Sequence, residues 1–279
     1  MHNEGIIVTG ANGFLGKNLF EQNKNLNLLT IKRTDVSNSN QLKLYSRDAE
    51  LIDAQDSQYS EFTLIHLATL FSVDLNTNNE IKDANLDYGQ GVLKKIEHLN
   101  LKKIIYTNSM FGFYKDEDAR SSYYSVTKNL FSEYLSRYTK DRSILFEEIY
   151  IDNNFGSNDK RSKVMPAIFK SFKNNYSNPI KNPEAFMNLL FIDDVVKRIN
   201  YSLESDTSGE SCFIDKKMIR VESIYKFIEN YIFNKSVEPS LLDYQENDYI
   251  SGYPEIDLKN IKLTPHEKSL ITATNEVMA

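Results

Sequence analysis

Tyr124 and Lys128, which could together transfer a proton, stand four residues apart in the segment Tyr-Ser-Val-Thr-Lys. On a helix this spacing puts both side chains on one face, so the phenol and the ammonium can converge. A free phenol has a pKa of about 10 and carries protons poorly at neutral pH, but a fixed cation stabilises phenolate and lowers that pKa. Tyr231 and Lys235 have the same spacing, so the residues around each pair must decide which is functional.

Three polar residues, Thr107, Asn108 and Ser109, follow an apolar run and precede Tyr124 in the chain. An open parallel sheet binds its ligands just outside the carboxyl ends of its strands, which is where these residues would lie. A hydroxyl there can donate to a substrate carbonyl oxygen as negative charge develops on it. The alternative is that these side chains only satisfy backbone groups at the end of a strand.

Gly10, Gly13 and Gly16 follow the first apolar run in the pattern G-x-x-G-x-x-G. At such a turn the first glycine permits a tight bend, the second permits close approach of a pyrophosphate, and the third lets the helix pack closely on the strand. The helix then presents free N–H groups and the positive end of its dipole to the phosphates. A glycine-rich turn without a ligand is the alternative, but a strand before and a helix after favour dinucleotide binding.

The second apolar run ends in Lys32 and Arg33. Sites for NAD usually place a carboxylate at this point to hold the ribose 2′-hydroxyl, whereas a 2′-phosphate requires cations. Two adjacent cations therefore favour NADP over NAD, although Asp35 lies nearby. The alternative is that both cations belong to a solvated loop.

Short apolar runs alternate with longer amphipathic stretches in the first half of the chain, which is typical of a parallel sheet covered by helices. The runs are nearly continuous in hydrophobicity, as expected of strands buried on both faces. We therefore predict an α/β fold: a Rossmann-type doubly wound parallel sheet with a smaller C-terminal lobe. The predicted strands are 5–9, 26–32, 63–67, 103–107 and 143–149, and the predicted helices are 17–23, 79–99 and 123–138.

The alternation loosens after about residue 150, where prolines divide the chain into shorter pieces. We predict a dinucleotide-binding domain over 1–155 and a smaller substrate lobe over 156–279, with the segment of about 186–203 returning to the first domain as a strand and a helix. Residues 219–233 form another amphipathic segment, and the closing stretch 257–279 is polar and short.

The composition excludes several other classes of protein. The 279 residues are 41% hydrophobic and carry 33 Lys and Arg against 39 Asp and Glu, a net charge of −6. Without a basic block, we expect no nucleic-acid partner. A lone cysteine, Cys212, cannot form an intramolecular disulfide or a thiolate metal site. No apolar run approaches the roughly 20 residues of a membrane span, and no export signal begins the chain, so we expect a cytoplasmic protein with no membrane contact.

Together these motifs resemble the extended short-chain dehydrogenases/reductases that act on nucleotide sugars. The matching segments, all in the family's order, are 9–16, His66 to Thr69, Asn85, 107–112, Tyr124 with Lys128, 153–156 and 191–195. The resemblance implies catalytic roles for Thr107, Tyr124 and Lys128. It also implies substrate contacts at Thr107, Asn108, Ser109 and Asn153, and cofactor contacts at Gly10, Asn12, Gly13, Phe14, Leu15, Gly16, Lys32, Arg33, Leu67, Ala68, Thr69, Asn85, Tyr124, Lys128 and Ile151.

Within this family the chain is most similar to the 4-keto reductases that make nucleotide-linked dideoxy sugars such as CDP-abequose. Family dehydratases carry an Asp-Glu pair after the threonine, because elimination requires an acid and a base. This chain has Asn108 and Ser109 there, and neither can remove a proton from carbon, which argues against dehydration.

The chain also departs from the family pattern. Tyr150 stands where many relatives have an arginine, and Met187-Asn188 stand where they have Arg-Asp, so the pyrophosphate could be held instead by Arg161, Lys163 or Lys170. We expect no metal at His66, which has no Cys or His neighbour in sequence. The pair Asp193-Asp194 is expected to cap a helix and join a structural network.

Three functions remain open. The first is an NADPH-dependent reductase of a nucleotide-linked 4-keto-6-deoxyhexose, serving surface-glycan biosynthesis. The second is an NAD-dependent nucleotide-sugar 4-epimerase, and the third is a regulatory protein that binds a dinucleotide without chemistry. The resemblance also implies a homodimer, paired through the helices 79–99 and 123–138.

Overall fold

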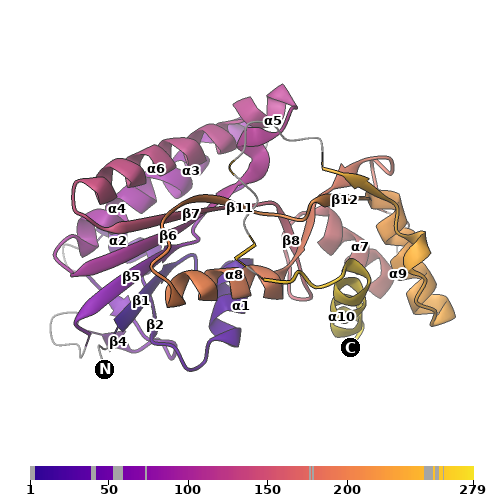
Figure 1. Cartoon of the computed structure of the whole chain (residues 1–279), viewed down its shortest axis with the longest axis horizontal. Coiled ribbons are helices and arrows are strands. Elements are labelled where there is room, and N and C mark those ends of the chain that lie inside the picture. Colours follow the sequence, from indigo (N-terminus) through magenta and orange to yellow (C-terminus); the bar gives the residue numbers. More distant parts are fainter. Residues whose placement is uncertain are drawn as a thin grey trace.

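The computed structural model describes residues 4–38, 42–52, 59–72, 74–175, 177, 179–247, 254, 258–259 and 261–279. Among these residues, the largest element is an eight-stranded sheet in the order β11-β7-β6-β5-β1-β2-β3-β4 (Figure 1). All pairs from β11 to β2 are parallel. The strands are β1 (Glu4–Thr9), β2 (Leu28–Thr30), β3 (Leu44–Tyr45), β4 (Leu51–Ile52), β5 (Glu61–His66), β6 (Leu101–Ser109), β7 (Leu145–Ile151) and β11 (Gly209–Phe213).

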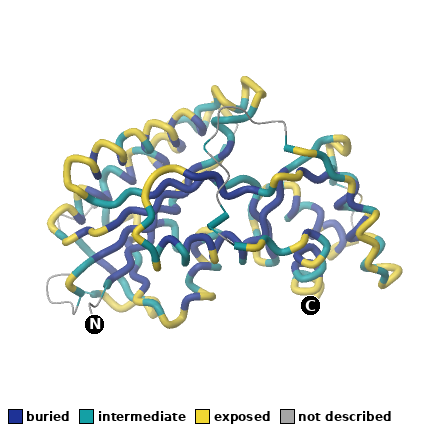
Figure 2. The backbone as a smooth tube through the Cα atoms, in the orientation of Figure 1, coloured by how far each residue is buried: buried dark blue, intermediate teal, exposed yellow. Residues whose placement is uncertain are grey.

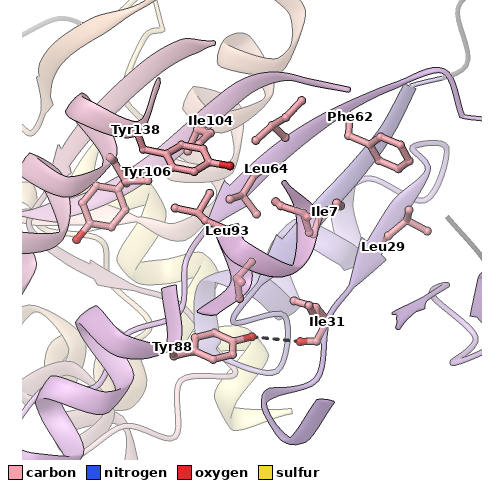
Figure 3. Packing of buried hydrophobic residues seen from close by; sticks show 14 of the residues in the cluster. Ile7, Leu29, Ile31, Phe62, Leu64, Tyr88, Leu93, Ile104, Tyr106 and Tyr138 are labelled. Carbon is pink, nitrogen blue, oxygen red and sulfur yellow. Dashed lines mark hydrogen bonds between the residues drawn. The ribbon is translucent and has the colours of Figure 1, made fainter. Parts of the chain in front are cut away.

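Helices cover both faces of this sheet because successive strand residues point to opposite sides. Ile7 of β1 faces a core that contains Val92 and Phe131, whereas Val8 faces a core that contains Leu19 and Val196. Figure 3 shows the first core, where the Tyr88 hydroxyl also donates to the Ile31 carbonyl oxygen at 3.3 Å. The first face carries α2 (Arg33–Asn38), α3 (Asn78–Lys82), α4 (Tyr88–Ile96) and α6 (Tyr123–Lys140), and the second carries α1 (Phe14–Gln22) and α8 (Ile192–Glu204).

This arrangement confirms the predicted fold class. The sequence did not reveal the edge of the sheet, where β3 pairs antiparallel with both β2 and β4. These strands have two residues each, too few to show an alternating pattern. Figure 2 shows burial concentrated along the central strands and the helix faces that cover them.

A buried group of charges ties α8 to the sheet. The Glu147 carboxylate of β7 accepts from Lys103 Nζ of β6 at 2.8 Å and from Arg198 Nη2 of α8 at 2.7 Å. The side chains of Lys103, Glu147 and Arg198 are 3%, 2% and 0% exposed. Lys103 also donates to the Ser202 carbonyl oxygen at 2.7 Å and Arg198 to Ser211 Oγ of β11 at 3.0 Å. These bonds hold α8 and the chain that follows it against the sheet. The next strand, β11, then joins the sheet beside β7, and it lies beyond the segment 186–203 that was predicted to return to the first domain.

The second lobe lies at the other end of the molecule (Figure 1). Its core gathers large apolar residues such as Phe169, Phe227 and Leu270. The polar closing stretch of the chain contains the helix α10, which buries Leu270 and Ala273 in this core. The elements are β8 (Asn153–Phe155), α7 (Val164–Lys173), β9 (Phe186–Met187), β10 (Leu189–Phe191), β12 (Lys217–Arg220), α9 (Val221–Asn234), β13 (Tyr244–Glu246) and α10 (His266–Met278).

No helix in the described part of the chain is both long and apolar enough to cross a membrane. The remaining short elements are the 3₁₀ turns η1 (Leu75–Thr77), η3 (Met110–Phe113) and η4 (Pro239–Leu241), the π-helical turn η2 (Asp83–Asp87), and the helix α5 (Glu117–Ser121).

Candidate active site

The turn between β1 and α1 forms a cradle that only glycine permits. Gly10 has φ +72°, and a Cβ there would meet the Ala68 backbone nitrogen at 2.7 Å. A Cβ at Gly16 would collide with the carbonyl oxygen of Gly10. Gly13 precedes α1, and no described side chain caps that helix. The free N–H groups of its first turn therefore point to an anion site that fits a dinucleotide pyrophosphate.

This cradle opens into a cleft of about 1380 Å³ at the carboxyl ends of the parallel strands. Asn85 is the one predicted site residue that does not line it. The predicted residues that line it are Gly10, Asn12, Gly13, Phe14, Leu15, Gly16, Lys32, Arg33, Leu67, Ala68, Thr69, Thr107, Asn108, Ser109, Tyr124, Lys128, Ile151 and Asn153.

Tyr124 and Lys128 occupy one face of α6, and both are buried. The Tyr124 ring meets Phe71 edge-on at a centroid distance of 5.0 Å and Phe111 at 5.8 Å. Lys128 Nζ donates to the Thr107 carbonyl oxygen at 2.7 Å and lies 4.2 Å from the centre of the Tyr106 ring. The pair is thus anchored beside the end of β6, whereas Lys235 ends α9 in a left-handed conformation.

The electrostatics of this pair differ from the expectation that Lys128 acidifies the phenol. Burial raises the pKa of Tyr124, and hydrogen bonds with Ser109 and Thr69 act against that rise. Burial also lowers the pKa of Lys128 to about 7, although the charge of Glu148 opposes this. The low-dielectric surroundings disfavour both charged forms, so Tyr124 holds its proton at neutral pH, which suits a proton donor.

The end of β6 divides its polar side chains between two sides. Asn108 points away from the phenol: its Nδ2 donates to Glu148 Oε1 at 2.6 Å, and its Oδ1 accepts from the Ser109 backbone nitrogen at 2.7 Å. The strand period of two puts Thr107 and Ser109 on the other side, where Ser109 bonds the phenol. Asn108 is therefore a support for the strand end, and Ser109 stands closer to the expected chemistry.

Asn85 lies behind the wall of the cleft and hydrogen-bonds two residues of that wall. It lies on the π-helical turn η2 and is buried. Its Oδ1 accepts from Thr69 Oγ1 at 3.0 Å and from the Leu70 backbone nitrogen at 2.7 Å. Asn85 thus fixes the wall segment that contains Thr69 without lining the cleft itself, and its contact with the cofactor stays a prediction.

At the far end of the cleft, Lys32 Nζ lies 3.7 Å from the centre of the Tyr45 ring. Arg33 forms an exposed ion pair with Asp83. The Tyr45 hydroxyl donates to Asp35 at 2.8 Å, and Asp35 does not line the cleft. Both cations predicted to select NADP thus border the cleft, without a competing carboxylate from Asp35.

A second cleft of about 1080 Å³ adjoins the first and extends into the smaller lobe. Arg161 lines both clefts, but it is held by the buried carboxylate of Asp159 at 2.7 Å and lies over the Phe14 ring. Lys163 and Lys170 also line the second cleft, and neither forms an ion pair within the described ranges. Burial lowers the pKa of Lys163, whereas Lys170 lies exposed on α7, so both amino groups are available to phosphate oxygens without breaking an ion pair.

Comparison with known proteins places these features in a family. The model of the NAD dependent epimerase/dehydratase family matches residues 6–214. The chain belongs to this family. The match confirms the predicted membership of the extended short-chain dehydrogenases/reductases and identifies the chain as an enzyme that uses a nicotinamide dinucleotide.

The individual proteins that the chain resembles share less than 30% of its sequence. A CDP-abequose synthase of Salmonella typhimurium (strain LT2) is 28% identical over 219 residues, covering 72% of this chain and 71% of the relative. The UDP-N-acetylglucosamine 4-epimerase of Methanobrevibacter ruminantium M1, solved with UDP-N-acetylmuramic acid, has a TM-score of 0.74 at 17% identity, over 99% of this chain and 98% of that one. RMD from Pseudomonas aeruginosa, complexed with NADPH, has a TM-score of 0.70 at 14% identity, over 98% and 99%. The two structures share the family fold with this chain.

His66 and the acid pair of this family member are structural. His66 Nδ1 lies 3.1 Å from Thr9 Oγ1, and the ring packs on Phe131 at 4.7 Å. Within the described residues no group of three or more His, Cys, Asp and Glu could hold a metal ion.

Asp194 is buried and accepts from the Thr264 backbone nitrogen at 2.6 Å, which fits the expected network. The expected capping role was wrong, because Phe191 occupies the N-cap of α8.

Replacing His66 with Phe should weaken the acid sensitivity of folding. Burial lowers the pKa of His66 from 6.5 to about 3. Below pH 6.5 the unfolded chain therefore gains a proton that the folded chain does not, and the free energy of unfolding falls as the pH falls. Between pH 7 and 5 this one group accounts for a loss of about 2 kcal/mol. Urea unfolding at both pH values should show a smaller loss in H66F. The exposed His98→Asn should behave like the wild type, and equal losses in H66F and wild type would contradict the assignment.

Sequence reasoning left several residues of the clefts unassigned, and four of them stand out. Phe71 and Phe111 line both clefts beside Tyr124, Asp152 lines the first cleft, and Arg47 borders the first near Phe20. Asp152 follows the end of a predicted strand, which was a usable signal. Phe111 lies within the segment 107–112 that resembles the family, which was a signal too, whereas Phe71 and Arg47 belong to no motif and only the folded chain brings them to the site.

Proposed function

We propose that this chain is an NADPH-dependent reductase of a nucleotide-linked 4-keto-6-deoxyhexose. The observation that carries the proposal is the buried Tyr124 in the first cleft, which lies beside Ser109 and against the rings of Phe71 and Phe111, and these two rings line both clefts. An apolar wall suits a sugar that lacks hydroxyl groups. The similarity to CDP-abequose synthases supports the same substrate class.

The residues divide the work of the reaction. When bound, the dinucleotide supplies the hydride that reduces the sugar C4 carbonyl to an alcohol. Tyr124 donates its phenolic proton to the carbonyl oxygen as negative charge develops there. Thr107 and Ser109 orient that oxygen, and Lys128 holds the end of β6 through the Thr107 carbonyl. Lys163 and Lys170 bind the substrate diphosphate in the second cleft.

A 4-epimerase that retains NAD is the second candidate, since the fold is shared with a UDP-N-acetylglucosamine 4-epimerase. The experiment incubates the purified protein with NADPH and CDP-, UDP-, dTDP- and GDP-linked 4-keto-6-deoxyhexoses and follows NADPH oxidation. Oxidation with one of them supports the reductase. No oxidation, together with tightly bound NAD released on denaturation, would favour the epimerase.

Lys32 and Arg33 should determine the preference for the phosphorylated cofactor. Because cations favour a 2′-phosphate, we expect Lys32→Ala with Arg33→Ala to weaken NADPH binding by about tenfold or more. NADH binding should change little. Titration of protein fluorescence with each cofactor measures both constants, and Lys17→Ala, at the same cleft but on α1, serves as the control. Equal losses for NADPH and NADH would contradict this assignment.

We also propose a homodimer, by resemblance to the family. Val126 and Leu130 of α6 are 41% and 46% exposed and would pack in such an interface. Light scattering should give twice the chain mass of 32.3 kDa. A monomer at micromolar concentration would overturn this part of the proposal.

A further inference from the structure

Asp152 provides a carboxyl group in the wall of the catalytic cleft that the proposed reaction does not use. It directly follows β7, whose last residue, Ile151, lies opposite Ser109 of β6 in the sheet register. The carboxyl ends of parallel strands meet at the same edge of a sheet. Asp152 therefore sits in the row of residues that also presents Ser109 to the phenol of Tyr124.

Tyr114 and Asn153 hold this carboxyl group in place. The Tyr114 hydroxyl donates to Asp152 Oδ1 at 2.7 Å and lies 2.9 Å from Oδ2, and Asn153 Nδ2 donates to Oδ1 at 2.8 Å. The Asn153 backbone N–H also donates to it. An ionised carboxylate has roughly four acceptor positions, so these three donors leave one for a ligand in the cleft.

A chain of aromatic rings connects this group to the phenol. The Tyr114 ring lies 5.1 Å from the Phe111 ring, which meets Tyr124 at 5.8 Å. Of these three rings, only those of Tyr114 and Tyr124 carry a hydrogen-bonding group, which is the phenolic hydroxyl. A carbohydrate hydroxyl brought beside Tyr124 thus meets apolar surface, with Asp152 as the nearby acceptor.

The charges around Asp152 suit the binding of a neutral hydroxyl. Burial raises the pKa of Asp152 to about 6, while the Tyr114 hydrogen bond and the charge of Lys163 act in the opposite direction. The groups that face it are Tyr114 from the segment after η3, Asn153 from β8, Lys163 before α7, and Tyr124 from α6. None of these forms an ion pair with Asp152, and at pH 7 its carboxylate is mostly ionised and ready to accept.

We propose that Asp152, positioned by Tyr114, is a substrate-binding residue that accepts a hydrogen bond from a hydroxyl of the sugar and so orients the sugar beside Tyr124. The inference rests on the proposed function and extends it, because it assigns the recognition of the sugar to one side chain. Tyr114 is a positioning residue that acts only through Asp152.

The test compares nucleotides with nucleotide sugars as ligands. Calorimetry with CDP, UDP, dTDP and GDP and with the corresponding nucleotide-linked glucoses, in the presence of NADP, gives the ratio of nucleotide to nucleotide-sugar dissociation constants, which measures the contribution of the sugar. In the wild type this ratio should exceed one at pH 7.5 and decrease as the pH falls through about 6. In Asp152→Asn it should fall by about tenfold, since a charge-assisted hydrogen bond is lost, and become independent of pH.

Three further variants separate binding from folding. Asp193→Asn is a matched control, because burial also raises the pKa of Asp193, but that residue lies on α8 outside both clefts. It should retain the wild-type ratio and its pH dependence. Tyr114→Phe should reduce the ratio less than Asp152→Asn. Added to Asp152→Asn, it should produce no further loss.

The outcomes distinguish the two proposals. If none of the nucleotides binds to the wild type, the proposed function fails. If nucleotides bind but the sugar adds nothing in the wild type, or if Asp152→Asn keeps the ratio and its pH dependence, the role of Asp152 is overturned while the proposed function stands.

Discussion

Tyr124→Phe should lower turnover by about 10² to 10⁴, the contribution typical of a positioned proton donor. The variant removes one oxygen and keeps the ring, so the contacts with Phe71 and Phe111 that hold the segment in place remain. NADPH binding should therefore weaken far less than turnover, by no more than the loss of one hydroxyl contact. Single-turnover kinetics with the 4-keto substrate, together with a fluorescence titration of NADPH, measure both quantities.

The neighbouring Tyr123→Phe is the control, because Tyr123 does not line either cleft. It should keep full turnover. Full activity in Tyr124→Phe would remove the phenol from the mechanism and favour a protein that binds the dinucleotide without this chemistry.

Glu147→Gln should destabilise the folded chain by about 3 to 5 kcal/mol, the usual effect of removing one partner from a buried ion pair. Arg198 and Lys103 would keep their places inside the protein without the carboxylate that both contact. Equilibrium unfolding in urea at pH 7.5 gives the change in free energy.

A surface pair provides the comparison. Arg137 and Glu133 lie 3.2 Å apart at 80% and 62% exposure, so Glu133→Gln should cost less than about 1 kcal/mol. A loss that small in Glu147→Gln would show that water or rearranged neighbours compensate for the missing charge, contrary to the expectation.

Local patterns sufficed to predict the centre of this fold. The glycine turn, the apolar strands and the Tyr124-Lys128 spacing each lie within a few consecutive residues, and the structure places the turn between β1 and α1 and both side chains on one face of α6. The helix predicted over 79–99 formed as α3, η2 and α4, and only the structure shows that its π-helical turn carries Asn85.

Features that depend on distant segments were not predictable. The carboxyl group of Asp152 is held by the hydroxyl of Tyr114, which is 38 residues away in the chain. The helix α10 buries Leu270 and Ala273 in the core of the smaller lobe, although its sequence is mostly polar. The pKa direction of Tyr124 was also not predictable, because it is set by burial, which outweighs the opposing hydrogen bonds of Ser109 and Thr69.

The wall between the two clefts has a thermodynamic consequence. Phe71, Phe111, Asn153 and Lys163 belong to both clefts, so a dinucleotide in one and a nucleotide sugar in the other would touch the same side chains. Any change that the first ligand makes in the position of these side chains is therefore met by the second. Linkage requires that the resulting change in affinity be the same factor in both directions.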